Sequence, residues 1–65
     1  MKNTKEFERI EKRLSKFNTL EAAKRCVYYH AVKPSAIILG DDGLYWVATR
    51  GDAERLYRMG YQYAD

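Results

Sequence analysis

The chain has 65 residues, one cysteine, one histidine and a formal net charge of +3. A single cysteine excludes a disulfide within the chain, and one cysteine with one histidine cannot complete a tetrahedral zinc site in a monomer. A chain this short buries only about 60% of its unfolded surface, so its stability has to come from efficient packing or from association.

The charge is unevenly placed along the chain. Residues 1–33 carry nine Lys or Arg and four acids, whereas residues 34–65 carry three and five. This asymmetry favours an anionic partner for the first half or head-to-tail contact between copies. The lone thiol suits a reducing compartment, no apolar run is long enough for a membrane span, and the charged N-terminus does not resemble a secretion signal. We therefore expect a cytoplasmic protein without membrane contact.

Two amphipathic helices are predicted in the first half of the chain. Apolar residues at three- and four-residue spacing predict a helix over about 4–17, with Phe7, Ile10, Leu14 and Phe17 on its inner face. Asn18 and Thr19 interrupt this pattern, and both are good helix-capping residues. The apolar spacing then resumes and predicts a second helix over about 20–31, which ends before Pro34.

A β-hairpin is predicted next, with strands over about 36–40 and 44–49. The connecting loop contains Asp41, Asp42 and Gly43, and a glycine there can adopt the positive φ of a bulged hairpin loop. Alternation along the second strand places Trp46 on one face of the sheet and Tyr45 on the other.

The last third predicts a helix over about 52–59 and a short strand over 61–64. Asp52 is the expected N-cap, and Gly60 is expected to end the helix so that Tyr61 packs on Leu56 in a Schellman motif. If the final strand lies beside the first strand of the hairpin, the strands form one small mixed sheet. The fold class is therefore a small single α+β domain over 1–65, in the order α-α-β-β-α-β.

Aromatic side chains are the strongest indication of function. The three helices are expected to cover one face of the sheet, which would leave aromatic residues on the other face to contact a partner or stack on bases. Alternatively, the rings fill a small core while their hydroxyls reach water. The predicted partner-binding residues are Tyr45, Trp46, Tyr61 and Tyr63.

Basic side chains follow the first helix on the side opposite its apolar stripe. They would steer a partner or track phosphates, although interspersed glutamates also fit an ordinary solvated helix face. The candidate residues are Lys2, Lys5, Arg9, Lys12 and Lys16, extended by Lys24 and Arg25.

Catalytic chemistry has little support in the sequence. Cys26 and His30 share one face of the second helix and could form a thiolate–imidazole pair or half of a metal site, but buried Cys and His are also ordinary core-edge residues. Asp41 and Asp42 are explained by turn geometry. Without a recognisable catalytic or cofactor motif, we expect no enzyme, no metal and no cofactor.

In its size, solubility and lack of catalytic motifs, the chain is similar to short orphan proteins of phages and mobile elements. Many of these act by binding and blocking a host machine, and the resemblance assigns no site residue. We expect a non-enzymatic binding module that docks an aromatic and basic surface onto a protein or nucleoprotein partner, as a phage-type inhibitor would by steric blocking. Direct nucleic-acid binding by the basic ridge is the first alternative, and a Cys/His-dependent catalytic or metal-binding role is the second. Edge strands and an aromatic face also favour a homodimer.

Overall fold

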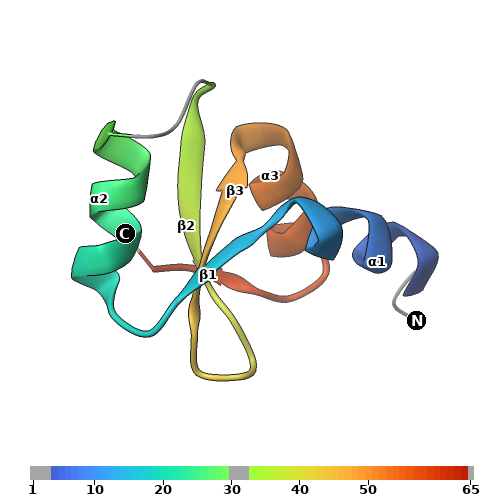
Figure 1. The fold of residues 1–65 in the computed structure, drawn as a ribbon. Coiled ribbons are helices and arrows are strands. Elements are labelled where there is room, and N and C mark those ends of the chain that lie inside the picture. Colours follow the sequence, from blue (N-terminus) through green and yellow to red (C-terminus); the bar gives the residue numbers. More distant parts are fainter. Residues whose placement is uncertain (1–3, 30–32, 65) are drawn as a thin grey trace.

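The structure, a computed structural model, describes residues 4–29 and 33–64. Within these residues, three helices and four strands form a small α+β domain, with α2 on one face of the sheet and α1 and α3 on the other (Figure 1). The predicted fold class is confirmed, with one strand more than expected. In chain order the elements are α1 (Thr4–Arg13), β1 (Ser15–Phe17), α2 (Leu20–Tyr29), β2 (Ser35–Leu39), β3 (Tyr45–Thr49), α3 (Arg50–Arg58) and β4 (Gln62–Tyr63).

The strands lie in the order β1-β3-β2-β4, and every neighbouring pair is antiparallel. As expected, β4 lies beside the first strand of the hairpin, with Ile38 opposite Tyr63. The expectation of a mixed sheet is wrong. β4 is parallel to β3, but β2 lies between them, so no two neighbouring strands are parallel. The sheet is therefore antiparallel throughout.

Two crossover connections explain why helices cover both faces. The β1–α2–β2 and β3–α3–β4 units each join parallel strands and pass over one strand between them. The units start from antiparallel strands and move across the sheet in the same direction, so crossovers of one hand place their helices on opposite faces. This is the arrangement in Figure 1, and it buries both sides of β2 and β3.

The segment after α1 corrects the first predicted helix, which ends at Arg13. Ser15–Phe17 instead form β1 and pair with Tyr45–Val47 of β3. Leu14 packs on the α3 side of the sheet and Phe17 on the α2 side, since three steps along an extended chain change face. The same three-residue spacing fits one stripe of a helix, which is why the sequence pattern extended the helix too far.

Thr19, one of the two predicted capping residues, caps the start of α2. The Thr19 hydroxyl accepts a hydrogen bond from the Ala22 N–H at 3.1 Å, which satisfies one of the unpaired donors of the first turn. α2 is described as far as Tyr29. Its predicted continuation to residue 31 falls on 30–32, outside the described residues.

The hairpin is confirmed. Three of its four strand boundaries shift by one residue, and the end at Thr49 is as predicted. Gly40 donates its N–H to the Leu44 carbonyl at 2.9 Å, and Gly43 donates to the Gly40 carbonyl at 3.2 Å. Gly43 has a φ of 81°, the positive value predicted for this loop. The turn therefore returns the chain as β3, which pairs antiparallel with β2.

Both ends of α3 have a recognisable cap, although the N-cap residue differs from the prediction. Thr49 is the N-cap, and its hydroxyl accepts a hydrogen bond from the Asp52 N–H at 3.4 Å, so the predicted N-cap at Asp52 is wrong. Asp52 instead lies within the first turn, where its carboxylate still interacts favourably with the positive end of the helix dipole. At the other end, Gly60 has a φ of 107° and the Tyr61 N–H donates to the Leu56 carbonyl at 3.1 Å. The predicted Schellman motif is confirmed.

The sheet separates two apolar cores, and the predicted alternation along β3 is confirmed. Trp46 and Ala48 face α1 and α3, whereas Val47 faces α2. The larger core contains Ile10, Ile38, Trp46, Ala48, Ala53, Leu56 and Tyr61, and the smaller one contains Ala23, Ile37 and Val47 with half-buried neighbours from β1 and α2.

Candidate functional site

The four aromatic residues predicted to bind a partner divide between the core and the surface. Trp46 is 1% exposed and Tyr61 is 8% exposed. Tyr45 is half-buried and packs against the smaller core. The expectation of an uncovered sheet face is wrong, because α2 packs on the second face. Tyr63, which is 46% exposed, offers the most surface among the four.

The acidic hairpin turn binds the polar atoms of the two buried rings. Trp46 donates its Nε1–H to Asp42 Oδ1 at 3.1 Å, and the Tyr61 hydroxyl donates to Asp41 Oδ2 at 3.3 Å. Burial, together with the nearby Asp41 carboxylate, raises the pKa of Tyr61. Sequence reasoning explained these acids as turn residues and missed this role, since no local spacing connects Asp41 to a ring 20 positions away.

The basic residues do not form one continuous ridge. Lys5, Arg9 and Lys12 are exposed on α1, whereas the predicted Lys2 lies outside the described residues. Lys16 was expected on this helix but lies on β1. A ridge of three exposed cations therefore remains on α1.

Lys16 instead covers the edge of the larger core. Its Nζ donates to Glu11 at 3.0 Å and lies 4.9 Å from the centroid of the Trp46 ring. The hydrogen bond to Glu11 raises the pKa of Lys16. Lys24 and Arg25 lie on α2, across the sheet from α1, so the seven predicted basic residues do not share one surface.

The structure describes one half of the predicted Cys26–His30 pair. Cys26 is a free, half-buried thiol packed against the smaller core, and His30 lies outside the described residues. In the part of the chain that the structure describes, no three metal-ligating side chains come together. Among the described residues, the fold therefore adds no further metal-ligating side chain to the Cys/His alternative.

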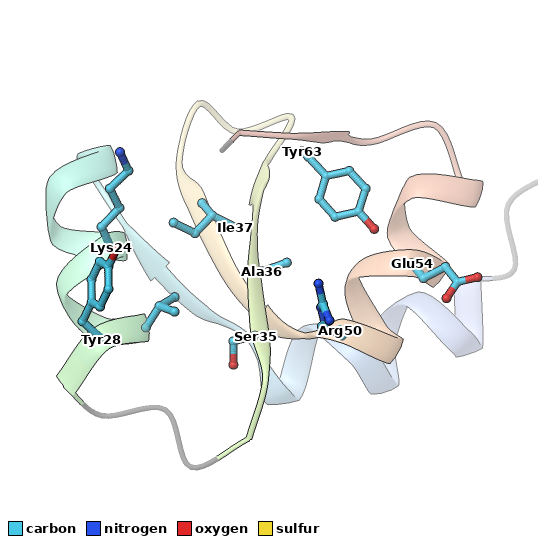
Figure 2. Close-up of a pocket in the computed structure, with 9 residues that line it drawn as sticks. Lys24, Tyr28, Ser35, Ala36, Ile37, Arg50, Glu54 and Tyr63 are labelled. Atoms are coloured by element: carbon cyan, nitrogen blue, oxygen red, sulfur yellow. The ribbon is translucent and has the colours of Figure 1, made fainter.

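A groove of about 690 Å³ lies at the edge of the sheet between α2 and α3. Figure 2 shows Ser35, Ala36 and Ile37 of β2 along its floor, between side chains that come from the two helices. Its volume lies within the range of ordinary ligand sites. The residues that line it are Lys24, Val27, Tyr28, Ser35, Ala36, Ile37, Arg50, Glu54 and Tyr63.

The groove lies beside the part of β2 that, among the described residues, extends beyond β4. β4 pairs with Ile38 and Leu39, and one further hydrogen bond joins the Ala64 N–H to the Ile37 carbonyl at 2.9 Å. In an antiparallel strand both backbone groups of a residue face the same neighbour, so Ser35, two positions from Ile37, also faces away from β3. Among the described residues, β4 does not extend along this part of β2.

The walls of the groove are aromatic and basic. Tyr28, which is 82% exposed, and Lys24 come from α2. Arg50 and Glu54 come from the first turns of α3, and the Tyr63 ring lies on their side of β2 (Figure 2). Sequence reasoning selected Tyr63 and Lys24 but not Tyr28 or Arg50, because their meeting depends on the crossover geometry of two distant helices.

A polar network on the opposite side of α3 is structural. Arg13 donates two hydrogen bonds to the Asp52 carboxylate, each at 3.0 Å, and Arg55 donates a third at 3.2 Å. The Asp52 side chain is 5% exposed. The hydrogen bonds from Arg13 hold the pKa of Asp52 below its usual range, although burial acts in the opposite direction. The network ties the end of α1 to the start of α3.

Comparison with known proteins gives no match to a family model, to a curated protein or to a solved structure. In the described ranges, none of the helices is both long and apolar enough to cross a membrane. The assignment of function therefore depends on the groove and on the exposed side chains around it.

Proposed function

We propose that this chain is a non-enzymatic binding module that docks onto a protein partner through the groove between α2, β2 and α3. The observation that carries the proposal is a hollow of about 690 Å³ in which Ser35, Ala36 and Ile37 of β2 lie between aromatic and basic side chains. Tyrosine and arginine are enriched at the energetic centres of protein interfaces, and both line this groove.

The exposed aromatic residues support this location. Tyr28 and Tyr29 are 82% and 79% exposed, and Tyr57 and Tyr63 form a tilted ring pair with centroids 5.4 Å apart. Tyr28 and Tyr63 border the groove from its two sides. An aromatic and basic docking surface thus remains the proposal, with Tyr28, Tyr63, Lys24 and Arg50 in place of the buried rings.

Affinity capture from an extract of the source cells tests this proposal. Wild type is compared with Arg50→Glu and with Lys5→Glu, which makes the same charge change at an exposed site on α1. We expect the same protein to be retained by wild type and by Lys5→Glu, with and without nuclease, and to be lost with Arg50→Glu. Retention that nuclease abolishes, or that Arg50→Glu leaves unchanged, would contradict the proposal.

A second candidate function is direct nucleic-acid binding by the exposed cations of α1. Lys5, Arg9 and Lys12 lie at three- and four-residue spacing on this short helix, where they could contact successive phosphates. This candidate predicts affinity for generic duplex or single-stranded DNA that falls steeply with salt. A flat titration at low salt, or no change when all three become Glu, would eliminate it.

A further inference from the structure

We propose that the groove also holds the acidic hairpin turn of a second copy of this chain, so that the acidic end of one copy binds the basic end of another. This inference goes beyond the proposed function, because a groove that holds the turn of a second copy is closed to any other partner. It requires contacts between side chains at the Ser35 end of the groove and no hydrogen bonds to the backbone of β2.

The hairpin turn forms the acidic end of the molecule. In Figure 1 the turn projects beyond the helices at one end of β2. Asp41 and Asp42 are exposed in it, and Lys16 links Asp42 to Glu11 of α1, with its Nζ 3.7 Å from Asp42 and 3.0 Å from Glu11. The three carboxylates outnumber the one ammonium group that binds two of them. This cluster therefore carries excess negative charge.

The start of β2 forms the opposite, basic end. Arg50 is exposed, and its backbone N–H donates to the Pro34 carbonyl at 3.1 Å, which places Arg50 near exposed Lys33. The Arg50 side chain also lines the groove (Figure 2). Glu54 is the one acid among the described residues that line the groove, and it already pairs with Arg58 at 2.6 Å. The cations at this end are therefore suited to bind a carboxylate.

The strand between them keeps the two ends apart. β2 has five residues, and at about 3.3 Å per residue it spans about 16 Å. The Debye length is about 8 Å at physiological ionic strength, so the charges at one end are largely screened from those at the other. Each end therefore presents its own field to a second copy, and the two fields are complementary.

The hairpin turn also has a shape that suits the groove. The two strands of a hairpin lie about 4.8 Å apart, whereas a helix with its side chains is about 10 Å wide. Gly43 adds no side chain to the tip, so Asp41 and Asp42 are its main functional groups. Asp41 already accepts a hydrogen bond from Tyr61, but a carboxylate has about four acceptor positions and can also bind Arg50 of a second copy.

The contact is expected to be weak and sensitive to salt. Ion pairs between exposed side chains contribute little individually, so we expect a dissociation constant on the order of 0.1–1 mM at low salt. Copies then remain separate when dilute and associate when concentrated. A partner that binds the groove more tightly would displace the turn.

The test measures light scattering and ¹H–¹⁵N chemical shifts of the full chain. We expect the average mass to rise between about 20 μM and about 1 mM at low salt, and to return to the monomer value above about 0.3 M salt. The Trp46 Nε1–H, which donates to Asp42, and the Ser35 amide should shift together over the same range. The amides of Lys5 and Arg9 on α1 should not shift.

Variants at the two ends have matched controls on α1. Arg50→Glu and Asp41→Lys should each weaken self-association about tenfold or more, because each places like charges in contact. Lys5→Glu and Glu8→Lys make the same charge changes at exposed positions of α1 and should alter it by less than about twofold. Asp41→Asn keeps an acceptor for Tyr61 and should still weaken self-association about threefold. Circular dichroism establishes that each variant is folded.

Mixing the two charge-reversal variants gives the decisive measurement. Arg50→Glu has lost its basic end and Asp41→Lys has lost its acidic end, so neither should self-associate alone. Their mixture combines the intact turn of the first with the intact basic end of the second and should regain association. Equal light scattering from the mixture and from the separate variants would overturn the inference.

The outcomes also separate this inference from the proposed function. A monomer at about 1 mM in low salt, self-association that Arg50→Glu leaves unchanged, or shifts that bypass the Trp46 Nε1–H would overturn the inference. Arg50-dependent capture of a different protein together with any of these results would keep the proposed function and discard only the second copy as an occupant. Self-association with all the expected changes, but without a captured protein, would keep the inference and remove the proposed function.

Discussion

At the scale of single residues, Asp52 is the most consequential polar side chain described. It is 5% exposed and accepts hydrogen bonds from Arg13 and Arg55, both of which keep about half of their side-chain surface in solvent. A buried carboxylate that lacked these partners would be costly, whereas the half-exposed arginines remain hydrated without it. The network therefore stabilises the contact of α1 with α3 chiefly by satisfying one buried charge.

We predict that Asp52→Asn lowers the free energy of unfolding by about 1–3 kcal/mol, because the replacement loses charge-assisted hydrogen bonds. Urea denaturation measures the change. Glu21→Gln is the matched control, since it breaks an exposed ion pair with Arg25 and should cost less than about 0.5 kcal/mol. Equal effects of the two substitutions would contradict the structural role of Asp52.

The same carboxylate predicts a pH dependence. Its pKa is lower in the folded protein than in the unfolded chain, so its contribution is complete above the usual aspartate pKa and is lost as the pH falls through the lower folded-state value. Wild type should therefore keep a constant stability advantage over Asp52→Asn from pH 7 to about pH 5 and lose it towards about pH 2. An advantage that persists unchanged to low pH would contradict this account.

Gly40 and Gly51 form a matched pair of glycine substitutions. A Cβ at Gly40 would collide with the indole ring of Trp46, whereas a Cβ at Gly51 would meet only Arg55 Nη1 at 3.9 Å. We predict that Gly40→Ala destabilises the protein by about 1–3 kcal/mol or more, because the buried ring has little room to move. Gly51→Ala, in the first turn of α3, should be neutral or stabilising. Thermal unfolding of both variants checks the contrast.

At the scale of elements, features governed by local chemistry were predicted well. The hairpin glycine, the Thr19 cap and the Schellman motif at Gly60 each depend on residues within a few positions of one another. Predictions failed where a distant partner decides the outcome. β1 forms because Ser15–Phe17 meet the edge of β3, a contact that spacing alone does not contain. The N-cap of α3 is the exception: Thr49 and Asp52 are only three positions apart, and the Thr-x-x-Asp spacing of a capping box was available in the sequence.

The existence of β1 has a direct spectroscopic test. Lys16 lies opposite Trp46. Trp46 directs its backbone groups towards β2, so Lys16 and Trp46 form a non-hydrogen-bonded pair, with α-carbons about 4.5 Å apart. We predict a strong nuclear Overhauser effect between their α-protons. Helical sequential contacts through residues 14–17, without this cross-strand contact, would instead support a helix over 4–17 and contradict β1.

At the scale of the whole molecule, helices on both faces change where a partner can bind. Sequence reasoning expected one open aromatic face, but the two crossovers bury Trp46 and Tyr61, and a groove lies between α2 and α3 along Ser35–Ile37 of β2 instead. The groove was not predictable from the sequence, because it is made by the lengths of two strands and the positions of α2 and α3. Because no aromatic sheet face is left open, that face no longer supports a homodimer. The exposed strand edges still permit a homodimer.

The central claim is that the groove, and not the α1 ridge, contacts the partner. It is tested most directly by measuring the affinity of the captured partner for Arg50→Glu and for the Lys5→Glu/Arg9→Glu/Lys12→Glu variant. We predict that Arg50→Glu reduces affinity by about tenfold or more, whereas the triple variant slows association and leaves the dissociation rate unchanged. Loss of binding in the triple variant with full affinity in Arg50→Glu would contradict the claim.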